Sequence, residues 1–180
     1  MKSFNSSVWK KDARIRRDAS LAVGRDPEQT TKKWKEDLRF IRALSKTIDW
    51  CTEHRVTVEF SGRSSGSYDP ATGTVTVNHK SSPMNQLFVL LHELGHFMVA
   101  CTEKGQRFSK GYRNVNPKLI GSNVNRLDIL DEEFEAWGRG WSLGEHLNIL
   151  KKEDRKTFDR IRVNSLKEYL RWSLKTHGYM

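Results

Sequence analysis

One stretch of the chain, residues 81–101, combines an apolar helix pattern with three ionisable side chains. Ser82 can cap the free amides at a helix start, and Pro83 suits the first helical position because the amide hydrogen that it lacks would have no partner there. From Leu87 to Cys101, apolar residues occupy every side of the expected helix. The helix should therefore be buried, with the rest of the chain folded around it.

The three ionisable residues of this helix are His92, Glu93 and His96. Burying such groups without partners costs free energy, so something must satisfy them. The histidines are about one turn and roughly 40° apart, so their rings face one point, and neutral imidazoles suit zinc. Glu93 projects roughly 100° to one side, where a general base could reach a water on the metal. The pattern H-E-x-x-H is typical of zinc peptidases, although a pair of hydrogen-bonded core histidines is the alternative.

A catalytic zinc ion needs a third protein ligand and an open position for water. The downstream candidates are Glu132, Glu133, Glu135 and His146, on residues 128–147, which are predicted to form a helix with acidic residues in its first turn. At 100° per residue, Glu133 lies at the centre of the apolar face of this helix. Glu132 lies about 100° away at the border, Glu135 about 200° away on the polar side, and His146 about 140° away.

A carboxylate in the middle of an apolar face must be paired or bound to metal. Glu133 is therefore the best candidate for the third ligand, and a buried ion pair with an arginine is the alternative. Ala136, Gly140 and Gly144 lie beside it on the wheel and would let another helix approach closely.

Three motifs resemble the ImmA/IrrE-type zinc metallopeptidases: a strand with Thr76-Val77-Asn78, the helix with H-E-L-G-H, and E-x-E-A at residues 133–136. The resemblance covers residues 55–140. It implies that Glu133 binds zinc and that the substrate is a regulatory protein, such as a DNA-bound repressor, in a phage, mobile-element or stress-response setting. Trp137 departs from the family pattern, which has Asn or Asp there, so the orientation of the zinc histidines is left open.

Two segments, residues 55–60 and 74–78, alternate apolar and polar side chains as strands do. Residues 61–73 between them are predicted to form a loop and a turn. We expect an α+β fold of the zincin-like type, in which a small antiparallel sheet packs against the central buried helix and several further helices. An exposed strand near the metal could pair with an extended substrate, which nominates Val75 and Val77, although an ordinary edge strand is the alternative.

The remaining segments complete the expected organisation. Residues 1–30 are a basic N-terminal arm or short helix, and residues 31–180 form a single zincin-like domain. This domain should open with an amphipathic helix at 31–54 and close with one or two helices beyond residue 148. Residues 102–126 make a long connection that could border the cleft, where Tyr112 is a candidate for oxyanion stabilisation and hence substrate binding.

Composition limits the function classes. The chain has 32 Lys and Arg against 22 Asp and Glu, a net charge of +10. This excess permits a nucleic-acid-associated protein, but there is no zinc-finger spacing and no clear helix-turn-helix, and the positive charge is spread. An inactive scaffold with the zinc-site fold is a further alternative. Neither a membrane span nor a secretory signal is indicated, and Cys51 and Cys101 are expected to be buried, reduced thiols of a cytoplasmic protein.

The sequence thus predicts a zinc-dependent endopeptidase in which His92, His96 and Glu133 hold Zn²⁺ and Glu93 is the catalytic base. Its predicted partner is a protein or peptide substrate, with nucleic acid as a further partner through the basic surface. The oligomeric state is left open.

Overall fold

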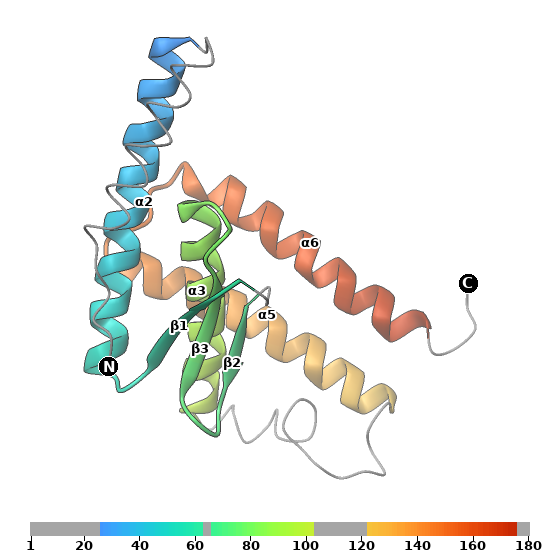
Figure 1. Ribbon diagram of the computed structural model, residues 1–180. Helices are drawn as coiled ribbons and strands as arrows, with labels where there is room; N and C mark the ends of the chain where they lie inside the picture. Colours follow the sequence, from blue (N-terminus) through green and yellow to red (C-terminus); the bar gives the residue numbers. More distant parts are fainter. Residues whose placement is uncertain (1–25, 63–65, 103–121, 176–180) are drawn as a thin grey trace. The chain divides into compact units, whose positions relative to one another are not determined.

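The computed structural model of the chain describes residues 26–62, 66–102 and 122–175 (Figure 1). Within these ranges the chain forms four helices and three strands, in agreement with the predicted α+β class. Most of the predicted basic arm, together with Tyr112, lies outside the described residues.

The described residues divide into two compact units. One unit contains the residues up to Ser67 together with Thr74–Leu90, and the other contains Tyr68–Gly73 together with the residues from Leu91 onward. Every residue of the predicted metal cluster belongs to the second unit.

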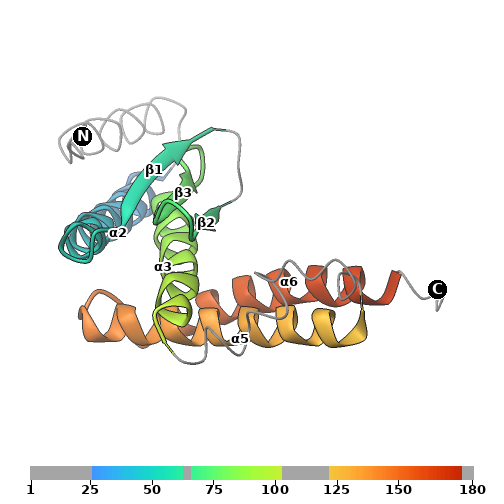
Figure 2. The same cartoon turned by 90° about the horizontal axis from the view of Figure 1, so that it is seen from below.

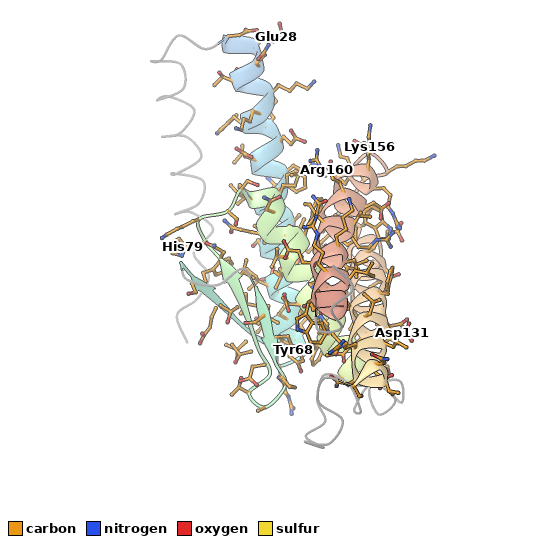
Figure 3. The ribbon with its side chains drawn as sticks, turned by 90° about the vertical axis from the view of Figure 1, so that its right-hand side faces the viewer. Glu28, Tyr68, His79, Asp131, Lys156 and Arg160 are labelled. Carbon is orange, nitrogen blue, oxygen red and sulfur yellow. The ribbon has the colours of Figure 1, made fainter. Side chains whose placement is uncertain are left out.

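The first helix of the structure, α2, spans Pro27–Glu53. It begins earlier than the predicted residue 31 because Asp26 caps it, with a side chain that accepts a hydrogen bond of 2.9 Å from the amide of Glu28. Pro27 suits the first helical position because proline has no amide hydrogen that would need a partner there. Glu28 in the first turn marks this end of the helix in Figure 3 and complements the helix dipole.

One face of α2 forms much of the core of the first unit. Ile41 and Leu44 are buried on it, as the spacing of apolar residues predicted, and Phe40 is buried there as well. The ring of Phe40 meets that of Phe88 edge to face, with centroids 5.9 Å apart. The opposite face of α2 is exposed and rich in lysine and arginine.

The strands are β1 (Thr57–Ser61), β2 (Ser67–Asp69) and β3 (Thr74–Asn78), and they form one sheet in the order β1-β3-β2. Strands β1 and β3 pair in parallel, with Val58 opposite Val75. The prediction of a purely antiparallel sheet is therefore wrong. Strand β2 was not predicted, because three residues are too few to show an alternating pattern.

The parallel pairing follows from the position of β2. The chain leaves β1 and passes along the outer strand β2, and it then reverses through a turn and enters β3 in the original direction. Asp69 holds the turn by accepting hydrogen bonds of 2.9 Å from the amide of Ala71 and the hydroxyl of Thr72. Gly73 ends it with a φ of 66°, a conformation that glycine adopts without a steric cost.

The position of β3 also corrects the predicted exposed edge. Because β3 is the central strand, its edges face β1 and β2, and its side chains Val75 and Val77 are buried. These residues therefore contribute to the core, and the strand edge predicted for substrate pairing does not lie at residues 74–78.

Helix α3 spans Pro83–Ala100 and begins at the predicted residue. The hydroxyl of Ser82 accepts a hydrogen bond of 3.3 Å from the amide of Asn85, which confirms the predicted cap. The side chain of Gln86 donates to the carbonyls of His79 and Ser81, at 3.1 and 2.6 Å, and so fastens the preceding loop to the helix. Most of α3 is buried, as the apolar residues on all sides predicted.

The second unit is built on helices α5 (Asn123–His146) and α6 (Asp154–Lys175), which run side by side in opposite directions (Figure 2). Phe158 of α6 packs edge to face against Trp137 and Trp141 of α5, with ring centroids 5.2 and 5.1 Å apart. The outer face of α6 is charged, and Lys156 and Arg160 are exposed there (Figure 3).

Helix α5 begins before the predicted residue 128 because Ser122 caps it by accepting a hydrogen bond of 3.1 Å from the amide of Asn125. As a result no acidic residue lies in its first turn, contrary to the prediction. Among the described residues, no helix has both the length and the apolar character that a membrane crossing requires.

Candidate active site

His92 and His96 lie one turn apart on the buried part of α3. Both residues are buried, with exposed fractions of 8% and 6%. Their ring centroids are 4.8 Å apart and the ring planes differ by 72°. The helical period alone brings the two imidazoles together, as the sequence predicted.

Glu133 reaches these histidines from α5, and only 1% of the residue is exposed. One carboxylate oxygen, Oε2, lies 3.3 Å from Nε2 of His92, and the other, Oε1, lies 3.4 Å from Nε2 of His96. Each of the three side chains offers a ligand atom, and these atoms lie within 4.8 Å of one another. The three residues predicted to form one cluster therefore meet in the structure.

Glycines allow α3 and α5 to approach closely enough for this contact, and Figure 2 shows the C-terminal half of α3 crossing α5. A Cβ atom on Gly95 would overlap the backbone carbonyl of Ala136, and one on Gly140 would overlap the carbonyl of Leu91. The close approach at Ala136 and Gly140 was predicted from the sequence, but the complementary role of Gly95 on α3 was not.

The two contacts of Glu133 are longer than most direct hydrogen bonds and have the spacing of neighbouring metal ligands. Charge-assisted N–H···O hydrogen bonds are shorter, about 2.7–2.9 Å. Neighbouring ligands of a tetrahedral zinc ion with bonds of about 2.0–2.1 Å lie about 3.3–3.4 Å apart. The two contacts of Glu133 have this separation, and two histidines with one glutamate are a known ligand set of catalytic zinc.

The surroundings of the cluster set its ionisation. Burial would raise the pKa of Glu133, but His92 and His96 outweigh burial and lower that pKa to about 2. Burial would likewise lower the pKa of His96, but the carboxylates of Glu132 and Glu133 raise it to about 9. Burial lowers the pKa of His92. The side chain of Glu133 is thus kept as a carboxylate, the form that binds a metal.

Glu93 is buried beside this cluster on α3. Its pKa is raised to about 7, mainly by burial and also by the negative charge of Glu133, against the opposing effects of His96 and of a hydrogen bond from the backbone amide of Tyr68. A carboxyl group with a pKa near neutrality can both accept and release a proton. Tyr68 lies on β2 (Figure 3), and its ring meets that of Phe97 edge to face at 6.0 Å.

The comparisons with known proteins agree with this geometry. Residues 53–118 match the IrrE N-terminal-like domain of the peptidase M78 family. The predicted family resemblance is confirmed, and the family is one of metallopeptidases. The matched segment of the IrrE N-terminal-like domain contains His92, Glu93 and His96, whereas Glu133 lies beyond it. No curated protein and no solved structure was found to match the chain.

Two contacts with the histidines of this IrrE-like segment were not predicted, because the sequence nominated Glu132 only as a candidate metal ligand and Trp137 only as a departure from the family pattern. Oε1 of Glu132 lies 3.2 Å from Nδ1 of His96, and the ring of Trp137 stacks on that of His92 with centroids 4.1 Å apart and planes 17° apart. The available signal for Glu132 was its place at the border of the apolar face, directly before Glu133. The contact of the Tyr68 amide with Glu93 has no sequence signal, because every residue except proline has an amide.

The remaining two candidates for the third metal ligand, Glu135 and His146, lie elsewhere on α5. Glu135 pairs with Arg139 at 2.9 Å on the partly exposed side of the helix, and His146 is exposed in its last turn. Neither belongs to the metal-ligand cluster. Both positions agree with the helical wheel, which put these residues away from the face of Glu133.

Proposed function

We propose that the chain is a zinc-dependent endopeptidase, with His92, His96 and Glu133 as the protein ligands of the metal. The observation that carries this proposal is the contact of the Glu133 carboxylate with Nε2 of both histidines, at 3.3 and 3.4 Å. The metallopeptidase family of residues 53–118 supports the same reaction class.

A bound zinc ion would supply Lewis-acid chemistry, by polarising the scissile carbonyl and lowering the pKa of a water molecule. Glu93 is the proposed catalytic base. Its carboxylate takes the proton of the attacking water and then returns this proton to the nitrogen of the leaving amine. In the metal-free protein, burial raises the pKa of Glu93 to about 7, and the backbone amide of Tyr68 donates a hydrogen bond to its carboxylate.

The proposed substrate is a protein or peptide, and the family resemblance favours a regulatory protein such as a repressor. An extended segment could be held by hydrogen bonds to a strand edge. We assign this role to β2, because it is an outer strand of the sheet and its residue Tyr68 contacts the proposed base. The strand that the sequence nominated, β3, is enclosed between its neighbours.

The test combines metal analysis with a cleavage assay. The purified chain should bind about one zinc ion and cleave casein in a reaction that EDTA abolishes and added zinc restores. Glu133→Ala should lose both the metal and the cleavage, whereas Glu145→Ala, at an exposed position on the same helix, should lose neither. Full metal loading without cleavage of any substrate would instead indicate a scaffold, and zinc binding by Glu133→Ala equal to wild type would remove Glu133 from the ligand set.

A second candidate function, binding of nucleic acid, is favoured by the outer face of α2. Five cationic residues recur there every three or four positions and share an arc of about 80° over about 21 Å: Lys32, Lys35, Arg39, Arg42 and Lys46. Four of them are exposed, and Arg39 is half-buried. Such a row can follow the phosphates of a nucleic acid, and it would deliver a peptidase to substrates bound there.

The salt dependence of duplex DNA binding tests this second candidate. Replacing Lys35 and Arg42 by alanine should reduce the slope of log K against log salt by about 0.9 for each phosphate that the variant no longer neutralises. The paired control replaces Lys156 and Arg160, which are exposed on α6 (Figure 3), and removes the same charge. Equal slopes for both double variants would mean that the net charge of +10, and not the row on α2, governs binding.

A further inference from the structure

The two histidines of the cluster have different outer partners. Nδ1 of His96 lies 3.2 Å from Oε1 of Glu132, in a contact between two buried residues. Nδ1 of His92 has no hydrogen-bond partner among the described residues, and its ring is covered by the stacked ring of Trp137. Among the described residues, therefore, only His96 has a hydrogen-bond partner at Nδ1, the ring nitrogen that faces away from Glu133.

The burial of Glu132 is not explained by the fold. Only 1% of the residue is exposed, and within the described part of the chain its one ion-pair contact is His96. Its second carboxylate oxygen, Oε2, has no hydrogen-bond partner there. Burying a carboxylate with a single partner is unfavourable, and an apolar residue at this place would cost less. The carboxylate therefore has a role that packing does not supply.

The contact of Glu132 with His96 can supply that role, because it determines which ring nitrogen of the histidine carries the proton. A neutral imidazole has one N–H and one nitrogen with a free lone pair. If Nδ1–H of His96 donates to Glu132, the proton is fixed on Nδ1 and the lone pair of Nε2 points toward Glu133 and the proposed metal position.

We propose that Glu132 is a positioning residue that fixes the tautomer and ring orientation of His96 for metal binding. This inference rests on the proposed function only in taking His96 as a metal ligand. The orienting carboxylate comes from the residue directly before the ligand Glu133 on α5. One turn of one helix thus provides both a metal ligand and the group that orients a ligand from α3.

Metal affinity measures this role directly. Zinc dissociation constants would be obtained by competition with a chromophoric chelator for wild type, Glu132→Ala, Glu132→Gln and Glu135→Gln. Loss of an outer hydrogen-bond partner typically weakens metal binding about 10–100-fold, which is the change expected for Glu132→Ala. Glu132→Gln keeps an oxygen that can accept the hydrogen bond and should recover most of the affinity. The matched control Glu135→Gln removes a nearby charge that is paired with Arg139 and should change nothing.

A second readout distinguishes positioning from a general effect on folding. In ¹⁵N-histidine NMR spectra of the zinc-loaded protein, His96 should have a slowly exchanging Nδ1–H proton that persists in Glu132→Gln and is lost in Glu132→Ala. If Glu132→Ala does not fold, wild type and Glu132→Gln still decide the question. A missing Nδ1–H signal of His96 in wild type would overturn the inference. Wild-type zinc affinity in Glu132→Ala would also overturn it.

The outcomes separate this inference from the proposed peptidase activity. Zinc binding that depends on Glu132 in a protein that cleaves no substrate would leave the inference standing and remove the peptidase. Cleavage that EDTA abolishes, with zinc affinity unchanged in Glu132→Ala, would remove the inference and leave the peptidase.

Discussion

Glu93 lies next to a proposed metal ligand but has a different chemical environment. Burial raises its pKa to about 7, whereas the two histidines lower that of Glu133 to about 2. Two glutamates in one site are thus suited to two tasks, proton transfer and metal binding. This difference arises from their immediate neighbours, and so it is tested by single substitutions.

Glu93→Gln should retain zinc and lose about 10²–10⁴-fold in kcat, because an amide cannot accept the water proton but leaves the metal ligands in place. Metal analysis and a cleavage assay on the same preparation check both halves of this prediction. Glu145→Gln, an exposed position on α5, should behave as wild type. Cleavage by Glu93→Gln at the wild-type rate would mean that another group is the base.

The two cysteines should differ in reactivity. Cys51 is fully buried, and burial raises its pKa to about 12, whereas Cys101 is exposed just beyond the end of α3. The prediction that both thiols are buried is wrong for Cys101, since the helix ends before it. Iodoacetamide should modify Cys101 in the folded protein and both residues after denaturation, as read by mass spectrometry of peptides. Modification of Cys51 at the same rate would show that α2 opens readily.

At the scale of elements, the crossing of α3 and α5 determines whether the cluster forms. Gly95 and Gly140 stand where side chains would meet the backbone of the opposite helix. Glycine in a helix interior costs roughly 0.5–1 kcal/mol relative to alanine, so these residues weaken each helix locally and permit the close contact. The three side chains of the cluster depend on that contact, because Glu133 comes from the other helix.

Gly140→Ala should lower the free energy of unfolding by about 1–3 kcal/mol or more, because the added methyl group overlaps the backbone of Leu91. Gly138→Ala is the matched control two residues earlier on α5. A Cβ at Gly138 meets nothing within 4 Å, so alanine there should stabilise the protein by roughly 0.5–1 kcal/mol. Urea unfolding of both variants measures the difference. A neutral or stabilising Gly140→Ala would contradict the close crossing of the two helices.

At the scale of the whole molecule, the metal should contribute to stability because an unfolded chain does not hold two helices in contact. A ligand that binds only the folded state adds about 4 kcal/mol at a free concentration 1,000 times its Kd. For a chain of this size that corresponds to a rise in Tm of about 8–16 °C.

Thermal unfolding with and without EDTA should reveal this rise in the wild-type protein. Glu133→Ala should unfold at one temperature in both conditions, since it lacks a ligand that joins α5 to the metal. A chelator-independent Tm in wild type would indicate that the cluster binds no metal under these conditions.

The sequence by itself determined the features that depend on the regular period of one helix. The start of α3 at Pro83, the joint direction of His92 and His96 and the central place of Glu133 on the apolar face of α5 all follow from 3.6 residues per turn and local capping. Each of these is set by residues within a few positions of one another, so no knowledge of packing was needed.

Only the tertiary structure decided the features that depend on two distant segments meeting. The parallel pairing of β1 with β3, the contact of Glu132 with His96 and the amide of Tyr68 on Glu93 each join residues far apart in the chain. Their geometry depends on strand order and on how closely glycines let α3 approach α5. The period of a helix specifies the direction of a side chain, but long-range packing determines which group of another segment that side chain contacts.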